Sequence, residues 1–424
     1  MLKILCSVYA CCPEMGSEPG MGWNWCYHLA KHCELYIITE KEFAGKIETT
    51  LPHIPQGKNM HFYYNPVPNK VRKMCWNQGN WLFYIHYKAW QKRTADIARQ
   101  ICNHEDINIL HQLNMVGFRE PGYLWKLSAE NNIPFIWGPI GGLKRFPLAY
   151  AKGSGLKMWS FLYLKNLLNI VQIKFDKRVD AAIRQASLLI ASIPSSYEAI
   201  KKYKAKESVV IPETGTVIRT DMVNNPQRFN GEYLTLLWAG KFDFRKKLDL
   251  AISTISLVTS MGVKVRFKVF GSGNKKQTMK AMLMAKRNGV ESIIEWMGNC
   301  PNEQVIAEMK KADLFFFTSV NEETSTVVLE AISCHLPVLC FDTCGMSTVI
   351  DEKVGDKIPL STMPNSIMDF ATKIKNYYEN RELLLQMSEN CQERAGELSW
   401  DNKANRVVAY YKNILNVKEY PSTA

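Results

Sequence analysis

The feature that most constrains this chain is a strand–loop–helix–strand unit with two glutamates near its centre. A strand-like run at 313–319 ends in a polar turn, and a helix is predicted to begin at Thr324 or Ser325 as its N-cap. In parallel α/β sheets, a helix N-terminus at the carboxyl end of a strand is where phosphate binds. Glu322 precedes this helix, and Glu330 lies two turns along it, roughly 10–12 Å from the cap at 1.5 Å per residue. The two acids therefore predict a site that holds a nucleotide-sugar from both ends.

Strand-like and helical patterns alternate along nearly the whole chain. Such alternation is typical of βαβ units and parallel sheets, so we expect an α/β fold. The predicted strands are 2–10, 35–39, 108–112, 134–137, 188–193, 234–241, 264–270, 293–298, 313–319 and 337–341. The predicted helices of the second half are 247–261, 275–288, 302–311 and 400–415.

The length of 424 residues indicates two domains. The pattern restarts after a polar stretch near 209–232, which gives a first domain over 1–205 and a second over 206–399. The terminal segment 400–424 is expected to pack back on the first domain.

The net charge of +13 indicates an anionic partner, which could be nucleotide phosphate, an anionic membrane surface or nucleic acid. Two stretches of the first half, 70–93 and 144–178, mix lysines and arginines with aromatic residues. This mixture is typical of a helix that lies on an anionic membrane. The alternative is a helix packed on the sheet with a solvated basic face.

Twelve cysteines without an even framework indicate reduced thiols, including the adjacent Cys11 and Cys12. The first ten residues are predicted to form a strand and not a signal peptide. No window reaches 18 consecutive apolar residues, as a spanning helix would need. We therefore expect a cytoplasmic protein, with peripheral contact to the inner face of a membrane and a location away from any membrane as the two alternatives.

Four further motifs follow predicted strands, and each also has a purely structural interpretation. The glycine-rich run 16–23 is either a loop that approaches a ligand or a plain turn. The basic run 239–247 is either a diphosphate clamp or a solvated charge run. His111 at a strand end either contacts a sugar or is a satisfied core histidine, and Gly271 either lies beneath a base or forms a turn.

Together these motifs resemble retaining glycosyltransferases of family 4, which have the GT-B fold. Glu322 and Glu330 match the E-x7-E motif of that family. The resemblance runs almost end to end through GSEPGMGW, INILH, WGPIGG, AGKFDFRKK, VFGSG and a final LSW-containing helix. It implies two Rossmann-like parallel-sheet domains that face a central cleft, with the acceptor on the first domain and the donor on the second.

The resemblance also implies roles for individual residues. Glu330 would accept hydrogen bonds from the donor ribose, and Glu322 would bind hydroxyls of the transferred sugar. Lys241 and Lys246 would neutralise the diphosphate. No metal and no cofactor would be needed, because cations and a helix end replace a metal, and the chain lacks an obvious D-x-D motif.

On the first domain, Gly20 and Gly22 would let a loop approach the donor, and His111 would contact the sugar near the reacting centre. The catalytic set implied in this way is His111, Glu322 and Lys246. The remaining donor-binding residues are Arg245, Gly271, Thr324, Ser325 and Thr326.

Two positions depart from the family pattern. Lys241 stands where arginine is more common, so a bidentate grip on phosphate is lost. Glu323 stands where glycine is common, and its side chain either crowds the phosphates or points to solvent. The expected function is transfer from a nucleoside-diphosphate sugar to a glycan or lipid-linked acceptor, in surface polysaccharide biosynthesis. A GT-B-like nucleotide-sugar epimerase and a basic nucleic-acid-binding protein are the alternatives, although no nucleic-acid-binding signature is present.

Overall fold

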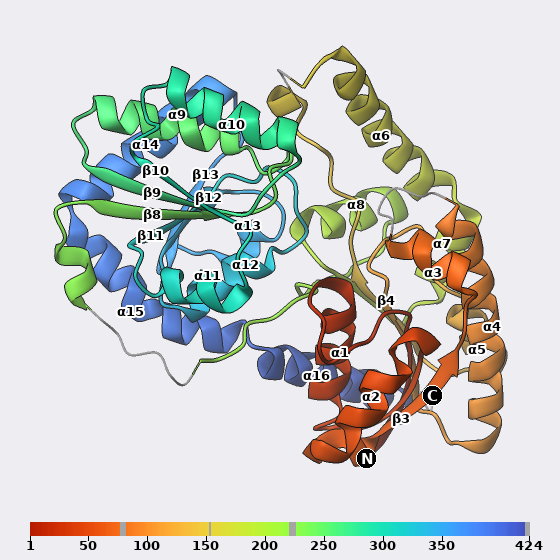
Figure 1. The fold of residues 1–424 in the computed structure, drawn as a ribbon. Coiled ribbons are helices and arrows are strands. Elements are labelled where there is room, and N and C mark those ends of the chain that lie inside the picture. The colour runs from red at the N-terminus through yellow and green to blue at the C-terminus, as the bar shows by residue number, and fades with distance from the viewer. Residues whose placement is uncertain (77–81, 152–153, 220–225, 420–424) are drawn as a thin grey trace. The chain divides into compact units, whose positions relative to one another are not determined.

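The computed structural model divides into two compact units, each with its own sheet and core (Figure 1). The structure describes residues 1–76, 82–151, 154–219 and 226–419. The first unit comprises Met1–Leu143, Asn169–Glu213 and Trp400–Ala424. The second unit comprises Lys144–Leu168 and Thr214–Ser399.

The first unit is built on a seven-stranded sheet in the order β3-β2-β1-β4-β5-β6-β7, and every described pairing in it is parallel. Its strands are β1 (Leu2–Val8), β2 (Cys33–Glu40), β3 (Met60–Asn65), β4 (Ile109–Asn114), β5 (Phe135–Ile140), β6 (Leu188–Ala191) and β7 (Val209–Val210). Its helices are α1 (Ser17–Leu29), α2 (Ala44–Thr50), α3 (Asn69–Trp76), α4 (Phe83–His104), α5 (Leu124–Asn131), α7 (Lys177–Gln185), α8 (Pro194–Lys204) and α16 (Trp400–Glu419). Helix α6 (Leu156–Phe175) begins in the second unit and ends in the first.

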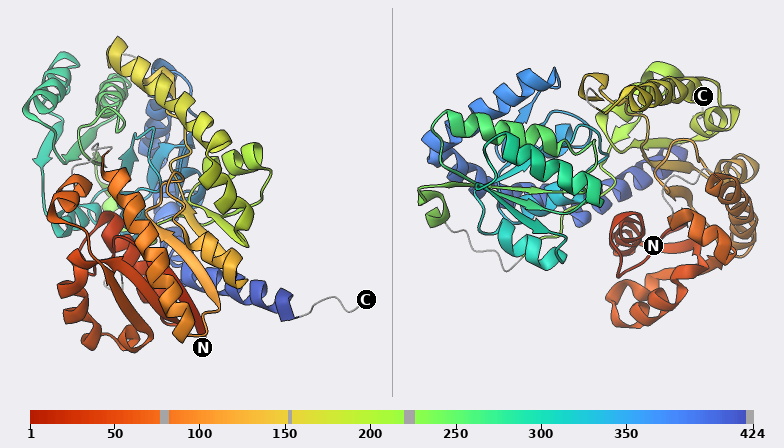
Figure 2. Two further views of the ribbon diagram at one scale, coloured as in Figure 1. Left: turned by 90° about the vertical axis from the view of Figure 1, so that its right-hand side faces the viewer. Right: turned by 45° about the horizontal axis from the view of Figure 1, so that its top comes forward.

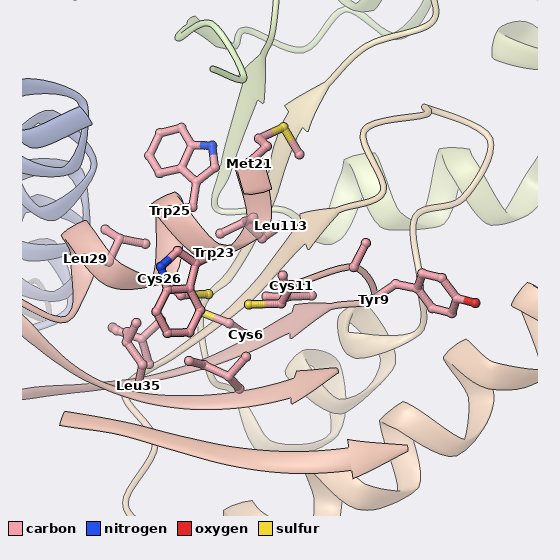
Figure 3. Close-up of a cluster of buried hydrophobic side chains, with 14 of the residues drawn as sticks. Cys6, Tyr9, Cys11, Met21, Trp23, Trp25, Cys26, Leu29, Leu35 and Leu113 are labelled. Atoms are coloured by element: carbon pink, nitrogen blue, oxygen red, sulfur yellow. The ribbon is translucent and has the colours of Figure 1, made fainter. Parts of the chain in front are cut away.

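The central strands of the first unit are apolar on both faces, so the sheet carries a core on each side. Ile4 and Cys6 of β1 point into the core beneath α1 and α16, whereas Leu5 points into the core beneath α4, α5 and α7. Figure 3 shows Trp25 and Cys26 of α1 in the first of these clusters, together with Cys6 of the sheet.

The second unit has six parallel strands in the order β10-β9-β8-β11-β12-β13. Helices α9, α10 and α14 cover one face, and α11, α12 and α15 cover the other (Figures 1 and 2). The strands are β8 (Leu234–Ala239), β9 (Val265–Phe270), β10 (Ile294–Gly298), β11 (Leu314–Phe317), β12 (Val338–Phe341) and β13 (Gly355–Ile358). The helices are α9 (Leu248–Ser260), α10 (Lys275–Arg287), α11 (Asn302–Met309), α12 (Thr326–Ser333), α13 (Met346–Val349), α14 (Met363–Glu379) and α15 (Arg381–Glu397).

All ten predicted strands are present, and the expectation of two parallel-sheet domains is confirmed. Three strands were missed. β3 and β13 carry half-exposed or polar residues, and the two residues of β7 lie in the stretch interpreted as a linker. The segment 144–168 was expected in the first domain but belongs to the second unit, because Phe146 and Tyr150 are part of the second core.

His111 is a core residue of the first unit and is fully buried on β4. Its Nε2 donates a hydrogen bond to the carbonyl oxygen of Gly138 at 2.8 Å, and its Nδ1 accepts one from the Tyr411 hydroxyl on α16 at 2.6 Å. Burial lowers the pKa of His111 to about 4. The ring is therefore neutral and ties β4 to β5 and α16.

This pKa predicts acid sensitivity with a definite sign. The unfolded chain protonates His111 near pH 6.5, whereas the folded protein does so only near pH 4, so stability is complete above pH 6.5 and falls between the two values. The loss amounts to about 3 kcal/mol from this group. We expect the His111→Gln variant to have a lower free energy of unfolding at neutral pH. We also expect that free energy to change less between pH 6.5 and pH 4 than in the wild type, as measured by urea unfolding. The exposed His53→Gln variant is the control, and an unchanged pH slope in His111→Gln would contradict the assignment.

Candidate functional site

The candidate site of the second unit lies where its strand order reverses direction. β8 and β11 are neighbours in the sheet, and the chain proceeds outward from them to opposite edges. In doubly wound sheets, ligands bind beside the carboxyl ends of the strands at such a switch point. The segments that leave these two strand ends are 240–247 and 318–325, which contain the basic run and the first of the two glutamates.

An ion pair joins these two segments. The Lys246 ammonium lies 2.9 Å from Oε1 of Glu322, and the Ser319 hydroxyl donates to the same oxygen at 2.9 Å. The ammonium also lies 5.0 Å from the centroid of the Phe317 ring. Both charged side chains are more than four-fifths buried, at 14% and 19% exposure. The result is a partly desolvated charge pair at the switch point, where electrostatic interactions are stronger than in water.

Three glycines bring the backbone close together beside this pair. Gly240 and Gly271 directly follow β8 and β9, and Gly298 is the last residue of β10. Gly271 has a φ of +109°, and a Cβ there would lie 2.0 Å from the Gly240 carbonyl oxygen. Its N–H donates to the Gly298 carbonyl at 2.6 Å. Gly271 is thus needed for the close contact between adjacent loops. This contact gives a structural reason for a glycine at this position, which the sequence alone did not decide.

The second glutamate, Glu330, lies on α12. This helix begins at Thr326 with Ser325 in the N-cap position, which confirms the predicted start. The Glu330 carboxylate accepts a hydrogen bond from Asn302 at 2.8 Å. Burial raises the pKa of Glu330, and the amide of Asn302 and the charge of Arg219 oppose that rise. Neither Asn302 nor Arg219 was singled out from the sequence.

The predicted cluster of cations in 241–247 splits in the structure. Lys246 reaches Glu322, but the Arg245 guanidinium is held by Asp243 of its own loop at 2.6 Å. Lys247 turns inward and donates to Asp249 at 2.8 Å, while Lys241 is exposed. The expected role of Arg245 in donor binding would therefore require it to leave Asp243.

Glu323 does not point freely to solvent, which was one of the two interpretations of its side chain from the sequence. Its carboxylate pairs with Lys144 at 2.8 Å, and both side chains are largely buried. The Gly345 N–H donates to the Glu323 carbonyl oxygen at 3.0 Å, and a Cβ on Gly345 would lie 2.3 Å from the Thr324 hydroxyl. Thr324 is thus packed against the loop after β12. Lys144 and Gly345 were not predicted, because they come from distant parts of the sequence.

On the first unit, Gly20 and Gly22 do not lie in an open loop. Both are buried inside helix α1, which begins at Ser17. A Cβ at Gly20 would lie 1.9 Å from the Met15 carbonyl oxygen, and one at Gly22 would lie 2.1 Å from that of Ala10. The close contacts of both glycines are thus with the chain's own backbone, and their approach to a ligand stays a prediction.

His111 likewise offers no nitrogen to a sugar here, because both of its ring nitrogens are bonded within the core. Two interpretations of His111 were open from the sequence, a core histidine with satisfied hydrogen bonds and a sugar contact. The structure shows a core histidine with satisfied hydrogen bonds.

A cavity of about 370 Å³ opens at the switch point of the first unit. Exposed Trp76 and Tyr84 stand beside the carboxylates of Glu18 and Glu42. The Trp76 indole donates to Glu42 at 2.8 Å, and Glu18 accepts from the Val116 N–H at 3.0 Å. The described lining contains no lysine or arginine. It consists of Tyr9, Ala10, Gly16, Ser17, Glu18, Pro19, Glu42, Phe43, Met74, Cys75, Trp76, Phe83, Tyr84 and Met115.

In the described part of the chain, no group of three or more His, Cys, Asp or Glu side chains is arranged to hold a metal ion. None of its helices combines the length and apolar character that crossing a membrane requires.

Comparison with known proteins relates the second unit to one family. Residues 221–394 match the family described as glycosyl transferases group 1. The phosphatidylinositol N-acetylglucosaminyltransferase gpi3 subunit of Schizosaccharomyces pombe is 26% identical over 185 residues, which are 41% of this chain and 39% of that protein. The chain spans less than half the length of the curated relatives it matches.

Solved structures with the same architecture cover nearly the whole chain. Sucrose-phosphate synthase from Thermosynechococcus elongatus has a TM-score of 0.64 and 14% identity, and it covers 98% of this chain and 100% of its own. HepE of Anabaena in complex with UDP has a TM-score of 0.62 and 13% identity, with coverage of 97% and 100%. The chain thus has the GT-B fold of two parallel-sheet units, and its residues 221–394 form a domain of the glycosyl transferases group 1 family.

Proposed function

We propose that this chain is a retaining glycosyltransferase that moves a sugar from a nucleoside-diphosphate sugar to a glycan or lipid-linked acceptor. The observation that carries the proposal is the Lys246–Glu322 pair at the switch point of a group 1 domain. A cation there is suited to a diphosphate, and a carboxylate beside it is suited to sugar hydroxyls. The fold relative HepE, which is in complex with UDP, supports a nucleotide donor.

The ion pair suggests how donor binding proceeds. A diphosphate beside Lys246 replaces Glu322 as the counter-ion of the ammonium. The Glu322 carboxylate is then available to accept hydrogen bonds from the transferred sugar. Glu330, further along α12, accepts from the ribose hydroxyls, and Asn302 orients its carboxylate. The start of α12 adds the positive end of a helix dipole for the phosphates, through the segment Thr324–Thr326.

During transfer, negative charge collects on the leaving diphosphate as the glycosidic bond breaks. Lys246 and the helix end stabilise that charge, which is the contribution expected to be largest in such a reaction. The acceptor hydroxyl attacks on the face from which the diphosphate departs, and a leaving phosphate oxygen takes the hydroxyl proton. The anomeric configuration is thereby retained without an enzymic nucleophile.

The acceptor is proposed to bind in the cavity of the first unit. Its aromatic side chains Trp76 and Tyr84 suit the apolar face of a sugar ring, and Glu18 and Glu42 suit its hydroxyls. The described lining has two carboxylates and no lysine or arginine, so it would repel an anionic group. We therefore propose that the part of the acceptor held there is a neutral sugar. This chemistry agrees with a growing glycan or lipid-linked saccharide, as in surface polysaccharide biosynthesis. All twelve cysteines are free thiols, which agrees with a cytoplasmic, peripheral enzyme.

Product analysis tests the proposal directly. Incubation with nucleotide-sugars and saccharide acceptors should give a glycoside with retained anomeric configuration and free nucleoside diphosphate. An isomerised nucleotide-sugar would instead indicate an epimerase. Salt-sensitive binding of random DNA without nucleotide-sugar turnover would indicate a nucleic-acid-binding protein.

We predict that Glu330→Ala chiefly weakens nucleotide binding, because the ribose loses its acceptor. Calorimetric titration with UDP and GDP should give a reduced affinity for the nucleotide that the wild type binds. Glu303→Ala is the matched control, since it removes an exposed glutamate from the neighbouring helix α11. Equal affinities in Glu330→Ala and the wild type would remove Glu330 from the ribose site.

We predict that Lys246→Ala lowers turnover by about one to three orders of magnitude, roughly the loss for one transition-state charge partner. Steady-state kinetics at saturating donor separate this effect from weaker binding. Lys286→Ala on α10 controls for the loss of one exposed lysine. Wild-type turnover in the Lys246→Ala variant would contradict the proposed role.

We also predict full activity in EDTA, because Lys246 and the start of α12 would supply the charge that a metal otherwise provides. The assay is repeated after chelation and after adding back magnesium or manganese. Activity that EDTA abolishes and a divalent ion restores would show that the diphosphate is held in another way.

A further inference from the structure

Helix α6 (Leu156–Phe175) is apolar on two opposite sides. Its inner side packs into the protein through Leu162 and Ile173, which are 4% and 1% exposed. An amphipathic helix normally buries its apolar stripe and exposes a polar face. The outer side of α6 therefore needs a separate explanation.

The outer side carries one continuous stripe of large apolar residues. They recur every three or four positions, as one face of a helix requires, and their exposure lies between 47% and 73%. The stripe, named here the α6 stripe, consists of Phe161, Leu164, Leu168, Val171 and Phe175. An exposed apolar surface of this kind marks an interaction site in a folded protein.

Charge and aromatic content indicate what covers the α6 stripe. The helix contains no acidic residue, and at 100° per residue Lys165 and Lys174 fall on opposite sides of Leu164. Trp159 and Tyr163, which are 39% and 46% exposed on the same helix, stack on each other with ring centroids 5.5 Å apart and an interplanar angle of 7°. Aromatic rings beside lysines are typical of the boundary between lipid headgroups and acyl chains.

The other basic-aromatic stretch is 70–93, of which residues 77–81 lie outside the described part of the chain. Two of its described aromatic residues, Trp76 and Tyr84, are exposed and line the cavity of the first unit. Its aromatic residues Phe83, Tyr87 and Trp90 are buried in the core of the first unit. The Arg72 guanidinium is held by the buried carboxylate of Glu40. The two stretches could not be told apart from their sequence. In the structure, most of the described residues of 70–93 fit the alternative of a helix packed on the protein with a solvated basic face.

We propose that the α6 stripe binds an anionic membrane surface, with the helix lying flat and its lysines among the headgroups. Twenty residues give a contact about 30 Å long. The apolar side chains supply insertion, and the lysines supply attraction to anionic lipid that salt weakens. The inference goes beyond the proposed sugar transfer, because it concerns attachment of the whole chain and needs no donor.

Flotation of the full chain with vesicles tests the proposal. Binding to vesicles of phosphatidylglycerol and phosphatidylcholine is expected at low salt, with weaker binding at high salt and to phosphatidylcholine alone. Leu164→Glu/Leu168→Glu should lower the vesicle partition coefficient at least about ten-fold, since two apolar anchors are lost. Thermal unfolding of each variant checks that it is folded.

The matched control is Met368→Glu/Leu383→Glu, which changes two exposed apolar residues on α14 and α15 with the same change in charge. It should bind vesicles nearly as well as the wild type. A second variant, Lys165→Gln/Lys174→Gln, should lose most of the salt-sensitive part of binding while keeping the stripe.

Three outcomes would overturn the proposal. The wild type could ignore anionic vesicles even at low salt. The Leu164→Glu/Leu168→Glu variant could bind like the wild type while Met279→Glu/Leu283→Glu fails, which would assign contact to the basic helix α10. Finally, gel filtration could show a dimer that only the α6 variant dissociates, without vesicle binding, which would make the stripe an interface between copies.

Discussion

The adjacency of β8 and β11 is the constraint on which the candidate donor site depends. Because the strand order reverses there, two loops that are far apart in the sequence leave the sheet side by side, and Lys246 meets Glu322 at 2.9 Å. The pair is formed inside one unit and is largely shielded from water. Its electrostatic attraction is consequently strong, and a diphosphate that replaces one partner would gain a cation already positioned and partly desolvated.

Glycines allow close backbone packing around the loops of both units. Gly271 lets the loop after β9 rest on the loop after β8, and Gly345 brings the loop after β12 against Thr324. Gly20 and Gly22 perform the same task for α1. From the sequence, the run 16–23 and Gly271 each had two interpretations, a loop that approaches a ligand and a plain turn. In the structure, a Cβ at any of these four glycines would lie only 1.9 to 2.3 Å from another atom of the protein.

The strand pattern made the fold predictable, because buried parallel strands appear in a sequence as apolar runs separated by helical segments. The positions of Glu322 and Glu330 and the start of α12 followed from the same pattern. Side-chain partners were not predictable in this way. The pairing of Glu323 with Lys144, the capture of Arg245 by Asp243 and the core bonds of His111 all depend on contacts that local sequence does not encode. Burial likewise separated α6 from the stretch 70–93, although the two look alike in composition.

The central claim is that the second unit holds a nucleoside diphosphate through the switch-point ion pair. Thermal unfolding with a series of nucleosides, monophosphates, diphosphates and nucleotide-sugars tests it most directly. A matching diphosphate at about 100 times its dissociation constant should stabilise the protein by about 2.7 kcal/mol. The corresponding nucleoside should stabilise it much less, and the difference should shrink when Lys246 is replaced. Stabilisation that is absent for every diphosphate, or equal for nucleoside and diphosphate, would contradict the account.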